Sequence, residues 1–193
     1  MTTFRTLIAA YFMCLAIHIP AVGLSASKSE TASRKIEVPF RLTTHGSLGT
    51  DVPGNSDLAA GTGWTLEAGI RRGPVELFAI VDRDNWMEFE YEVRLNTGVF
   101  NAGVGASVLL FDNRVAISVS LGTSTLLFNA IFDKAGQTGI FVDIRPATLR
   151  WPITRRMHLV FAPVSFFLMM PVLHDPVLKR LEYRTSIGFE VTL

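Results

Sequence analysis

Carboxylates and guanidiniums recur at every second position in two segments of the sequence. The first segment carries Glu88, Glu90, Glu92 and Arg94, and the last carries Glu182, Arg184 and Glu190. In a β-strand this spacing puts all the charges of a segment on one face, because successive side chains point to opposite sides. Facing carboxylates and guanidiniums can form bidentate ion pairs that fill a confined interior. The same residues also allow a narrow channel with an acidic lining.

Catalytic chemistry has a weaker basis in the sequence. His158 and Ser165 are the nearest candidates for a histidine–serine pair. They differ in parity and lie roughly 23 Å apart at about 3.3 Å per residue, so they face opposite sides of one strand. No Gly-x-Ser-x-Gly elbow is present. His174-Asp175 falls in a predicted external loop, where solvation explains the pair. We predict no catalytic, cofactor-binding or metal-binding residues and no cofactor.

The final thirteen residues form the cleanest strand pattern. The odd positions from Leu181 to Leu193 share one face, and the charged residues share the other. The mean hydropathy of +0.34 is high for an exported chain, yet most apolar residues alternate with other residues instead of forming long runs. Lipid on one face of each strand and polar groups on the other account for both features. The net charge of +1 gives no electrostatic footprint for nucleic acid.

Period-two segments separated by turn chemistry recur along the chain. They cover residues 36–42, 64–70, 75–81, 88–95, 102–111, 115–121, 125–132, 140–144, 157–167 and 177–193. The predicted fold is all-β, a closed antiparallel up-and-down transmembrane β-barrel of ten strands. Eight strands are the alternative, should two shorter segments merge. Either even count leaves both ends of the barrel on one rim.

The connections between these segments carry further expectations. The sequence predicts turns at 72–74, 82–85, 96–98, 112–114 and 122–124, a long external loop at 45–63, and an unusually long inner loop at 146–156. Pro39 and Pro163 each require a bulge or a strand end, because proline cannot donate a ladder hydrogen bond. Residues 157–173 also allow a transmembrane helix near the lower length limit of about 17 residues.

The amino terminus has the features of an export signal. Residues 1–27 begin with a short basic stretch, continue with an apolar core and end in small residues, which predicts a signal peptide cleaved between 23 and 27. A disordered lead-in over 28–34 precedes a barrel over 35–193. An uncleaved anchor and a lipoprotein attached through Cys14 are the alternatives. Cleavage would remove the only cysteine, and with it any disulfide or thiolate site.

From Lys35 to Leu193 the pattern resembles the small outer-membrane β-barrels of Gram-negative bacteria. Such barrels end in a strand of alternating apolar residues with a terminal aromatic, which the barrel-assembly machinery reads. The matching residues here are Tyr183, Ile187, Phe189, Val191 and Leu193, with leucine in the place of the usual aromatic. The resemblance implies an outer-membrane location, with outer-membrane lipid and the assembly machinery as partners.

The predicted function is a non-catalytic structural or partner-binding membrane component with a polar lumen filled by side chains. Other envelope proteins would bind through loop 45–63 or the rims. The predicted lumen comprises Glu37, Arg41, Glu67, Arg71, Glu76, Glu88, Glu90, Glu92, Arg94, Asp143, Arg145, Glu182, Arg184 and Glu190, and the predicted interfacial girdle comprises Trp64, Trp86, Tyr91, Trp151 and Tyr183. The alternatives are a narrow porin-like channel, a lipid A-modifying enzyme and a soluble periplasmic lipocalin-like barrel with its apolar faces inward.

Overall fold

The computed structural model describes residues 36–51, 58–88, 94–129, 135–173 and 178–193. Nine strands cover nearly all of them. They are β1 (Ile36–Glu37), β2 (Pro39–Asp51), β3 (Leu58–Arg72), β4 (Val75–Glu88), β5 (Arg94–Leu110), β6 (Val115–Asn129), β7 (Thr138–Pro152), β8 (Met157–Val172) and β9 (Leu178–Thr192).

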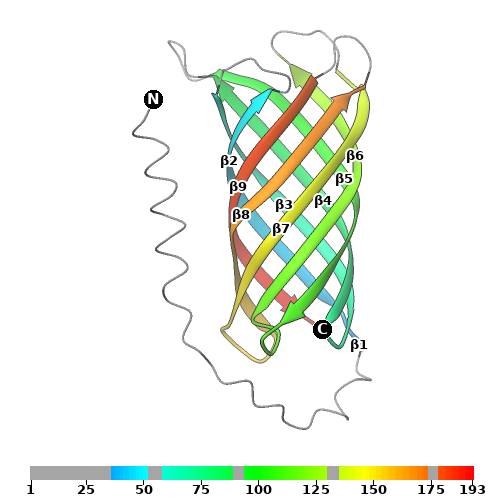
Figure 1. The fold of residues 1–193 in the computed structure, drawn as a ribbon, viewed down its shortest axis with the longest axis vertical. Helices are drawn as coiled ribbons and strands as arrows, with labels where there is room; N and C mark the ends of the chain where they lie inside the picture. Colours follow the sequence, from blue (N-terminus) through cyan, green and yellow to red (C-terminus); the bar gives the residue numbers. More distant parts are fainter. Residues whose placement is uncertain (1–35, 52–57, 89–93, 130–134, 174–177) are drawn as a thin grey trace. The chain divides into compact units, whose positions relative to one another are not determined.

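Antiparallel pairing of sequence neighbours runs from β2 to β9, and β9 then pairs with β2. This last pairing extends from Pro39 opposite Thr192 to Asp51 opposite Arg180. The sheet is therefore a closed barrel, with β1 and the carboxyl terminus at the same end (Figure 1). We call this the turn end, and the end reached by Asp51 and Leu178 the loop end.

The short strand β1 continues β2 in an unchanged register against β3. Glu37 lies opposite Arg71, and Phe40 lies opposite Ala68. The break comes at Val38, directly before Pro39, which has no N–H to donate to a ladder. Val38 still exchanges backbone hydrogen bonds with Leu193, at N–O distances of 3.3 and 3.0 Å. The barrel thus has eight strands, so the prediction of ten is wrong and the eight-strand alternative is correct.

Two merged segments explain the difference in strand number. The predicted turns at 82–85 and 122–124 lie inside β4 and β6, and the turn predicted at 96–98 lies inside β5. The single strand predicted over 88–95 is wrong, because Glu88 ends β4 and Arg94 begins β5, and these two strands pair antiparallel. Residues 89–93 lie outside the described part. Asp82 and Asp84 are fully buried in the barrel. Inward positions of this barrel hold the polar and small residues that turns also use.

The connections predicted to be long are shorter in the structure. Residues 45–50 of β2 pair with residues 58–63 of β3, so the prediction of an external loop over all of 45–63 is wrong. Strand β7 continues to Pro152, which leaves 153–156 as the connection where a long inner loop was predicted. Residues 157–172 form β8, not a helix, and the register shift between Ala162 and Ser165 is the bulge expected at Pro163. Among the described residues, no helix has the length and apolarity to cross a membrane.

Two tight turns at the turn end agree with the sequence prediction. Gly73 joins β3 to β4 with φ of 60°, a value that glycine adopts without steric cost. Phe111, Asp112 and Asn113 join β5 to β6 with φ values of 52°, 55° and 65°. Aspartate and asparagine tolerate this left-handed region better than most residues. Both turns therefore form where local chemistry favours them.

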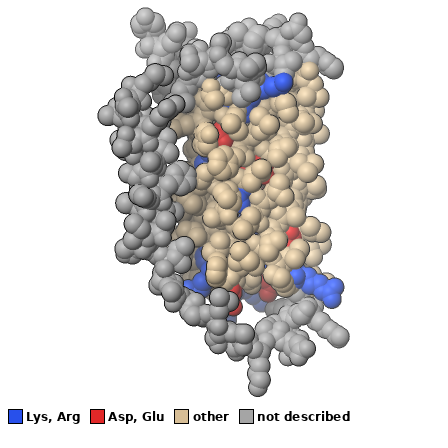
Figure 2. Space-filling view, viewed as in Figure 1, with Lys and Arg blue, Asp and Glu red and all other residues tan. Residues whose placement is uncertain are grey.

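The two faces of the wall differ in chemistry. Outward side chains are mostly apolar and exposed, with Leu77 at 62% and Phe189 at 53%. The visible outer wall in Figure 2 is accordingly mostly tan, with charged atoms in scattered small spots and toward the two ends. Inward side chains of the same strands include buried arginines, glutamates and aspartates. This arrangement is the reverse of a lipocalin-like barrel, which has its apolar faces inward.

Candidate functional site: the barrel interior

Charged side chains fill the interior in two groups along the barrel axis. We call Arg41, Glu67, Arg71, Glu76, Asp143, Arg145, Arg150 and Glu190 the turn-end cluster, and His45, Asp82, Asp84, Asn101, Glu182 and Arg184 the loop-end cluster. Each group draws on strands from several sides of the wall, because inward positions recur at every second residue of every strand.

Glu190 joins four strands in the turn-end cluster. Its Oε2 accepts a hydrogen bond from Arg41 on β2 at 2.8 Å, and its Oε1 accepts one from Arg71 on β3 at 2.9 Å. Arg150 on β7 donates to the same Oε1. Glu190 itself is 0% exposed. One carboxylate therefore links the first, second, sixth and last strands of the barrel.

The remaining acids of the turn-end cluster extend this network. Arg41 also pairs with Glu67, and with Glu76 at 3.2 Å. Arg145 bonds Glu67 and, through its Nε, Asp143 at 2.7 Å. Charge-assisted hydrogen bonds of this kind offset the cost of placing charges away from water.

Arg184 is the centre of the loop-end cluster. Its Nε donates to Glu182 at 2.8 Å, and its terminal nitrogens donate to Asp82 at 3.3 Å and to Asp84. Asn101 on the adjacent strand β5 donates to Asp82 at 2.8 Å. The guanidinium carbon of Arg184 also lies 3.3 Å from the ring centroid of Phe167, a cation–π contact.

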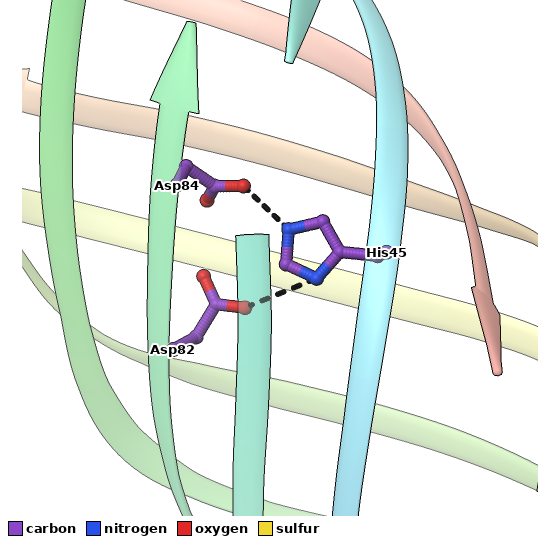
Figure 3. A group of neighbouring side chains, drawn as sticks. All are labelled: His45, Asp82 and Asp84. Atoms are coloured by element: carbon purple, nitrogen blue, oxygen red, sulfur yellow. Dashed lines mark hydrogen bonds and ion pairs between the residues drawn. The ribbon is translucent and has the colours of Figure 1, made fainter. Parts of the chain in front are cut away.

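His45 lies between two aspartates of the loop-end cluster (Figure 3). Its Nε2 is 2.6 Å from Asp84 Oδ1, and its Nδ1 is 3.9 Å from Asp82 Oδ1. Within the described residues, these three side chains form the group whose ligand atoms lie close enough together, within 4.8 Å, to hold a metal ion. Their carboxylates already accept hydrogen bonds from Arg184, Asn101 and Thr65. A guanidinium thus supplies the positive charge that a metal would bring.

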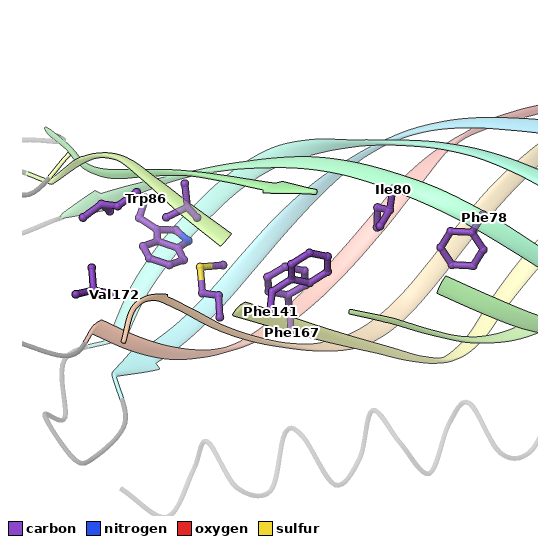
Figure 4. Close-up of a cluster of buried hydrophobic side chains, with 9 residues drawn as sticks. Phe78, Ile80, Trp86, Phe141, Phe167 and Val172 are labelled. Carbon is purple, nitrogen blue, oxygen red and sulfur yellow. The ribbon is translucent and has the colours of Figure 1, made fainter. Parts of the chain in front are cut away.

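An apolar plug closes the lumen at the loop end. It consists of Trp86, Val99, Leu126, Phe141, Phe167, Met169 and Val172, all buried. Figure 4 shows Trp86 and Val172 nearest the end and Phe141 and Phe167 deeper inside. The rings of Phe141 and Phe167 stack with centroids 5.3 Å apart, and the Arg180 guanidinium lies 3.8 Å from the Trp86 ring centroid.

Small residues on β5 and β6 make room for the long charged side chains. The inward positions there include Ser107, Ser118, Ser120 and Ser124. A small cavity of about 10 Å³ beside the loop-end cluster is lined in part by His45. This volume holds about one water molecule. The described interior is therefore a packed core with polar contents, as expected for a barrel of eight strands.

The predicted site residues of the last strand lie on two different faces of the barrel wall. Glu182, Arg184 and Glu190 are buried inside, whereas Tyr183, Ile187, Phe189, Val191 and Leu193 are exposed on the outer wall. Glu90 and Glu92 lie outside the described residues, and Glu88 and Arg94 are opposite each other at the ends of β4 and β5. The role of the outward residues in assembly stays a prediction.

Other sequence candidates are not brought together. His158 begins β8 at the turn end, and Ser165 is buried inside the barrel seven residues further on. His174-Asp175 lies outside the described residues. The prediction that Trp86 belongs to an interfacial girdle is wrong, because its ring is 1% exposed and lies in the plug.

Of the remaining girdle candidates, three lie in the described part of the chain and one lies outside it. Trp64, Trp151 and Tyr183 face outward, and Tyr91 lies outside the described residues. The sequence pattern does not identify His45, Asp82 and Asp84 as interior residues, because it predicts a loop at His45 and a turn at Asp82 and Asp84. Parity could have identified them. Asp82 and Asp84 have the same parity as the inward residues Glu76 and Phe78, and His45 has the same parity as Arg41 and Thr43.

Comparison with known proteins finds structures of similar fold but no match by sequence. No protein-family description and no curated sequence matches the chain. Among solved structures, Neisserial surface protein A aligns with a TM-score of 0.55 and 13% identity, over 80% of this chain and 96% of its own. Ail, the attachment invasion locus protein of Yersinia pestis, solved with the heparin analogue sucrose octasulfate, aligns with a TM-score of 0.50 and 14% identity, over 81% and 99%.

The fold is that of small Gram-negative outer-membrane β-barrels. The resemblance expected from the sequence is confirmed for the fold. At these identities the likeness concerns the arrangement of the strands alone, and the chemistry of this protein follows from its own residues.

Proposed function

We propose that this protein is an integral outer-membrane β-barrel whose lumen does not conduct and which acts as a structural or partner-binding component of the envelope. The observation that carries the proposal is the contrast between an apolar outer wall and an interior filled with paired charges.

The outer wall supports the membrane part of the proposal. Large apolar side chains such as Leu42, Leu77 and Leu121 are more than half exposed. Their exposure to water would forgo roughly 25 cal/mol for each Å² of apolar surface, whereas lipid solvates them. Pairing of β9 with β2 leaves no open sheet edge, which is the condition for a sheet to span a bilayer.

The filled interior supports a non-conducting role over a channel. An ion entering from the loop end would first meet the apolar plug, and then the loop-end cluster, in which Arg184 bonds three acids. The turn-end cluster blocks the remaining path through the bonds of Arg41 and Glu190. Partners would therefore bind at the rims or through the connections at the loop end, such as the one that follows Asp51.

Fractionation combined with heat-modifiable gel mobility tests the membrane assignment. We expect the protein in the carbonate-insoluble membrane fraction, with faster migration of the unheated folded barrel. Recovery in the soluble periplasmic fraction would refute it. Sequencing of the mature amino terminus tests the proposed cleavage between residues 23 and 27.

Reconstitution into planar bilayers tests the non-conducting lumen. We expect no single-channel steps from the folded protein, and regular steps would favour the channel alternative. Lipid A analysed by mass spectrometry with and without the gene tests the enzyme alternative, which predicts a modified species that depends on the protein.

A further inference from the structure

We propose that Arg83 and Asn85 form a surface site for the phosphate group of a lipid headgroup in the leaflet at the loop end. This inference rests on the proposed membrane location. It is carried by the position of one outward-facing arginine on β4 and by the residues beside it.

Cross-strand rows on the outer wall show where this arginine lies. Leu66, Val81 and Ala102 are opposite one another on β3, β4 and β5 and form an apolar row. The next row toward the loop end consists of Trp64, Arg83 and Phe100. The row after that consists of Thr62, Asn85 and Gly98. Arg83 thus occupies the row in which the wall changes from apolar to polar.

The same change occurs on other strands. Outward residues of β6 are apolar up to Leu121, are followed by Thr123 and Thr125, and end with the exposed Leu127. On β7 the apolar outward residues end at Ile140, and Thr138 comes before them. Polar outward residues therefore occur toward the loop end of β3, β4, β6 and β7.

The depth of Arg83 agrees with this boundary. Arg83 lies eight residues after Val75, at the start of β4. At about 3.3 Å per residue and a tilt of roughly 35–45°, this places it about 19–22 Å above the turn end, near the top of an apolar band of about 25 Å. A charged side chain is costly at the bilayer centre and tolerated at this level, where its stem lies in lipid and its head reaches the interface.

Arg83 has no internal partner to explain its charge. Among the described residues, no side chain forms an ion pair or hydrogen bond with it, and its buried Nε is unpaired. Every arginine of the turn-end cluster, in contrast, has a carboxylate partner. Asn85, two residues along the same face, likewise has no side-chain partner within the described part.

The chemistry of these groups fits a phosphate. A guanidinium presents two parallel N–H donors to phosphate oxygens, and the Asn85 amide can donate a further one. Trp64 and Phe100 flank Arg83 on the neighbouring strands and would contact the acyl chains just below the headgroup. The site therefore combines an anion-binding group with an apolar surface, which suits a phosphorylated lipid better than a free anion.

Native mass spectrometry of the full folded barrel in zwitterionic detergent tests the site. The probes are diphosphoryl lipid A, the same lipid without phosphates, and inorganic phosphate. We expect the wild type to retain one diphosphoryl lipid A and to lose this preference with the dephosphorylated lipid. Arg83→Gln should weaken retention about tenfold, the effect of losing one charge-assisted hydrogen bond, and Asn85→Ala should weaken it less.

Arg114→Gln is the matched control. Arg114 is an exposed arginine at the turn end, and its side chain has no ion pair among the described residues. We expect retention within about twofold of the wild type. Equal weakening by both substitutions would overturn the inference in favour of general charge attraction. Complete displacement by millimolar inorganic phosphate would also overturn it, because the site would then bind a free anion.

Failure of the proposed lipid site can be distinguished from failure of the proposed membrane location. Heat-modifiable mobility establishes that each variant is folded before lipid is added. A folded, membrane-derived wild type that retains no diphosphoryl lipid A refutes the site and leaves the proposed function intact. Recovery of the wild type from the soluble fraction would instead refute the proposed function.

Discussion

Replacement of Glu190 by glutamine should strongly destabilise the barrel. Glu190 accepts hydrogen bonds from Arg41, Arg71 and Arg150, and it is fully buried. Glutamine keeps one acceptor oxygen but turns an NH₂ donor toward guanidinium donors. At least one guanidinium then loses its partner, and all three lose the compensating charge.

The size of the effect follows from these contacts. Breaking a buried ion pair by removing one partner costs about 3–5 kcal/mol. We expect Glu190→Gln to lower the free energy of unfolding by about this amount, a large fraction of the roughly 5–15 kcal/mol typical of a domain. The assay is urea unfolding in detergent micelles, followed by tryptophan fluorescence and by gel mobility.

Glu182→Gln provides the matched comparison. Glu182 is equally buried, but among the described residues it accepts a hydrogen bond from Arg184 alone, and its Oε1 has no partner. We expect a loss of about 1–3 kcal/mol, the cost of one unsatisfied buried group. Equal effects of the two substitutions, or a change below about 0.5 kcal/mol for Glu190→Gln, would show that the turn-end cluster does not hold the strands together.

Three further predictions concern the wall, the plug and the strand packing. Phe189→Asp should strongly reduce insertion, measured by membrane fractionation, because a charge facing lipid costs about 2–4 kcal/mol at depth. Thr192→Asp, on the opposite face, should reduce insertion less. Equal tolerance of the two substitutions would contradict the assigned facing. Phe167→Ala should lower the free energy of unfolding by about 3–5 kcal/mol, and an unchanged urea midpoint would argue against a packed plug. Gly105→Val should cost about 1–3 kcal/mol, because an added Cβ would clash with the Phe78 ring. Wild-type stability of this variant would show that the ring moves freely.

The facing of each strand could be predicted from the sequence. From Leu181 to Leu193 the odd positions are mostly apolar and all charged residues are at even positions. The structure places Phe189 outside and Glu190 inside. Parity carries this information because a strand has only two sides and only one of them contacts the interior. The same argument correctly placed Arg41, Glu67 and Arg145 inside.

The number of strands could not be predicted from the same pattern. Asp82 to Asn85 and Gly122 to Ser124 have the composition of turns, yet they lie inside β4 and β6. In a soluble sheet such runs end a strand, because polar residues there face water. Here the interior itself is polar, so aspartate, glycine and serine continue the strand.

The partners within the interior were also beyond sequence reasoning. The contact between Arg41 and Glu190 joins residues 149 positions apart. Parity indicates that both side chains point inward, but the choice among the available acids depends on barrel closure and register. Strand register therefore decides which charges pair, and the composition of the lumen alone does not.

The pairing of β2 with β9 has a consequence for the rate at which the barrel forms. The other seven pairings join neighbouring strands, so each can form as a local hairpin, whereas this one must close a loop of nearly the whole chain. Contacts of such long range form slowly. Until they form, the sheet has two unpaired edges, which readily pair with other chains. The residues along this junction, Arg41 and Glu190 among them, therefore govern how long a half-built barrel remains open to aggregation.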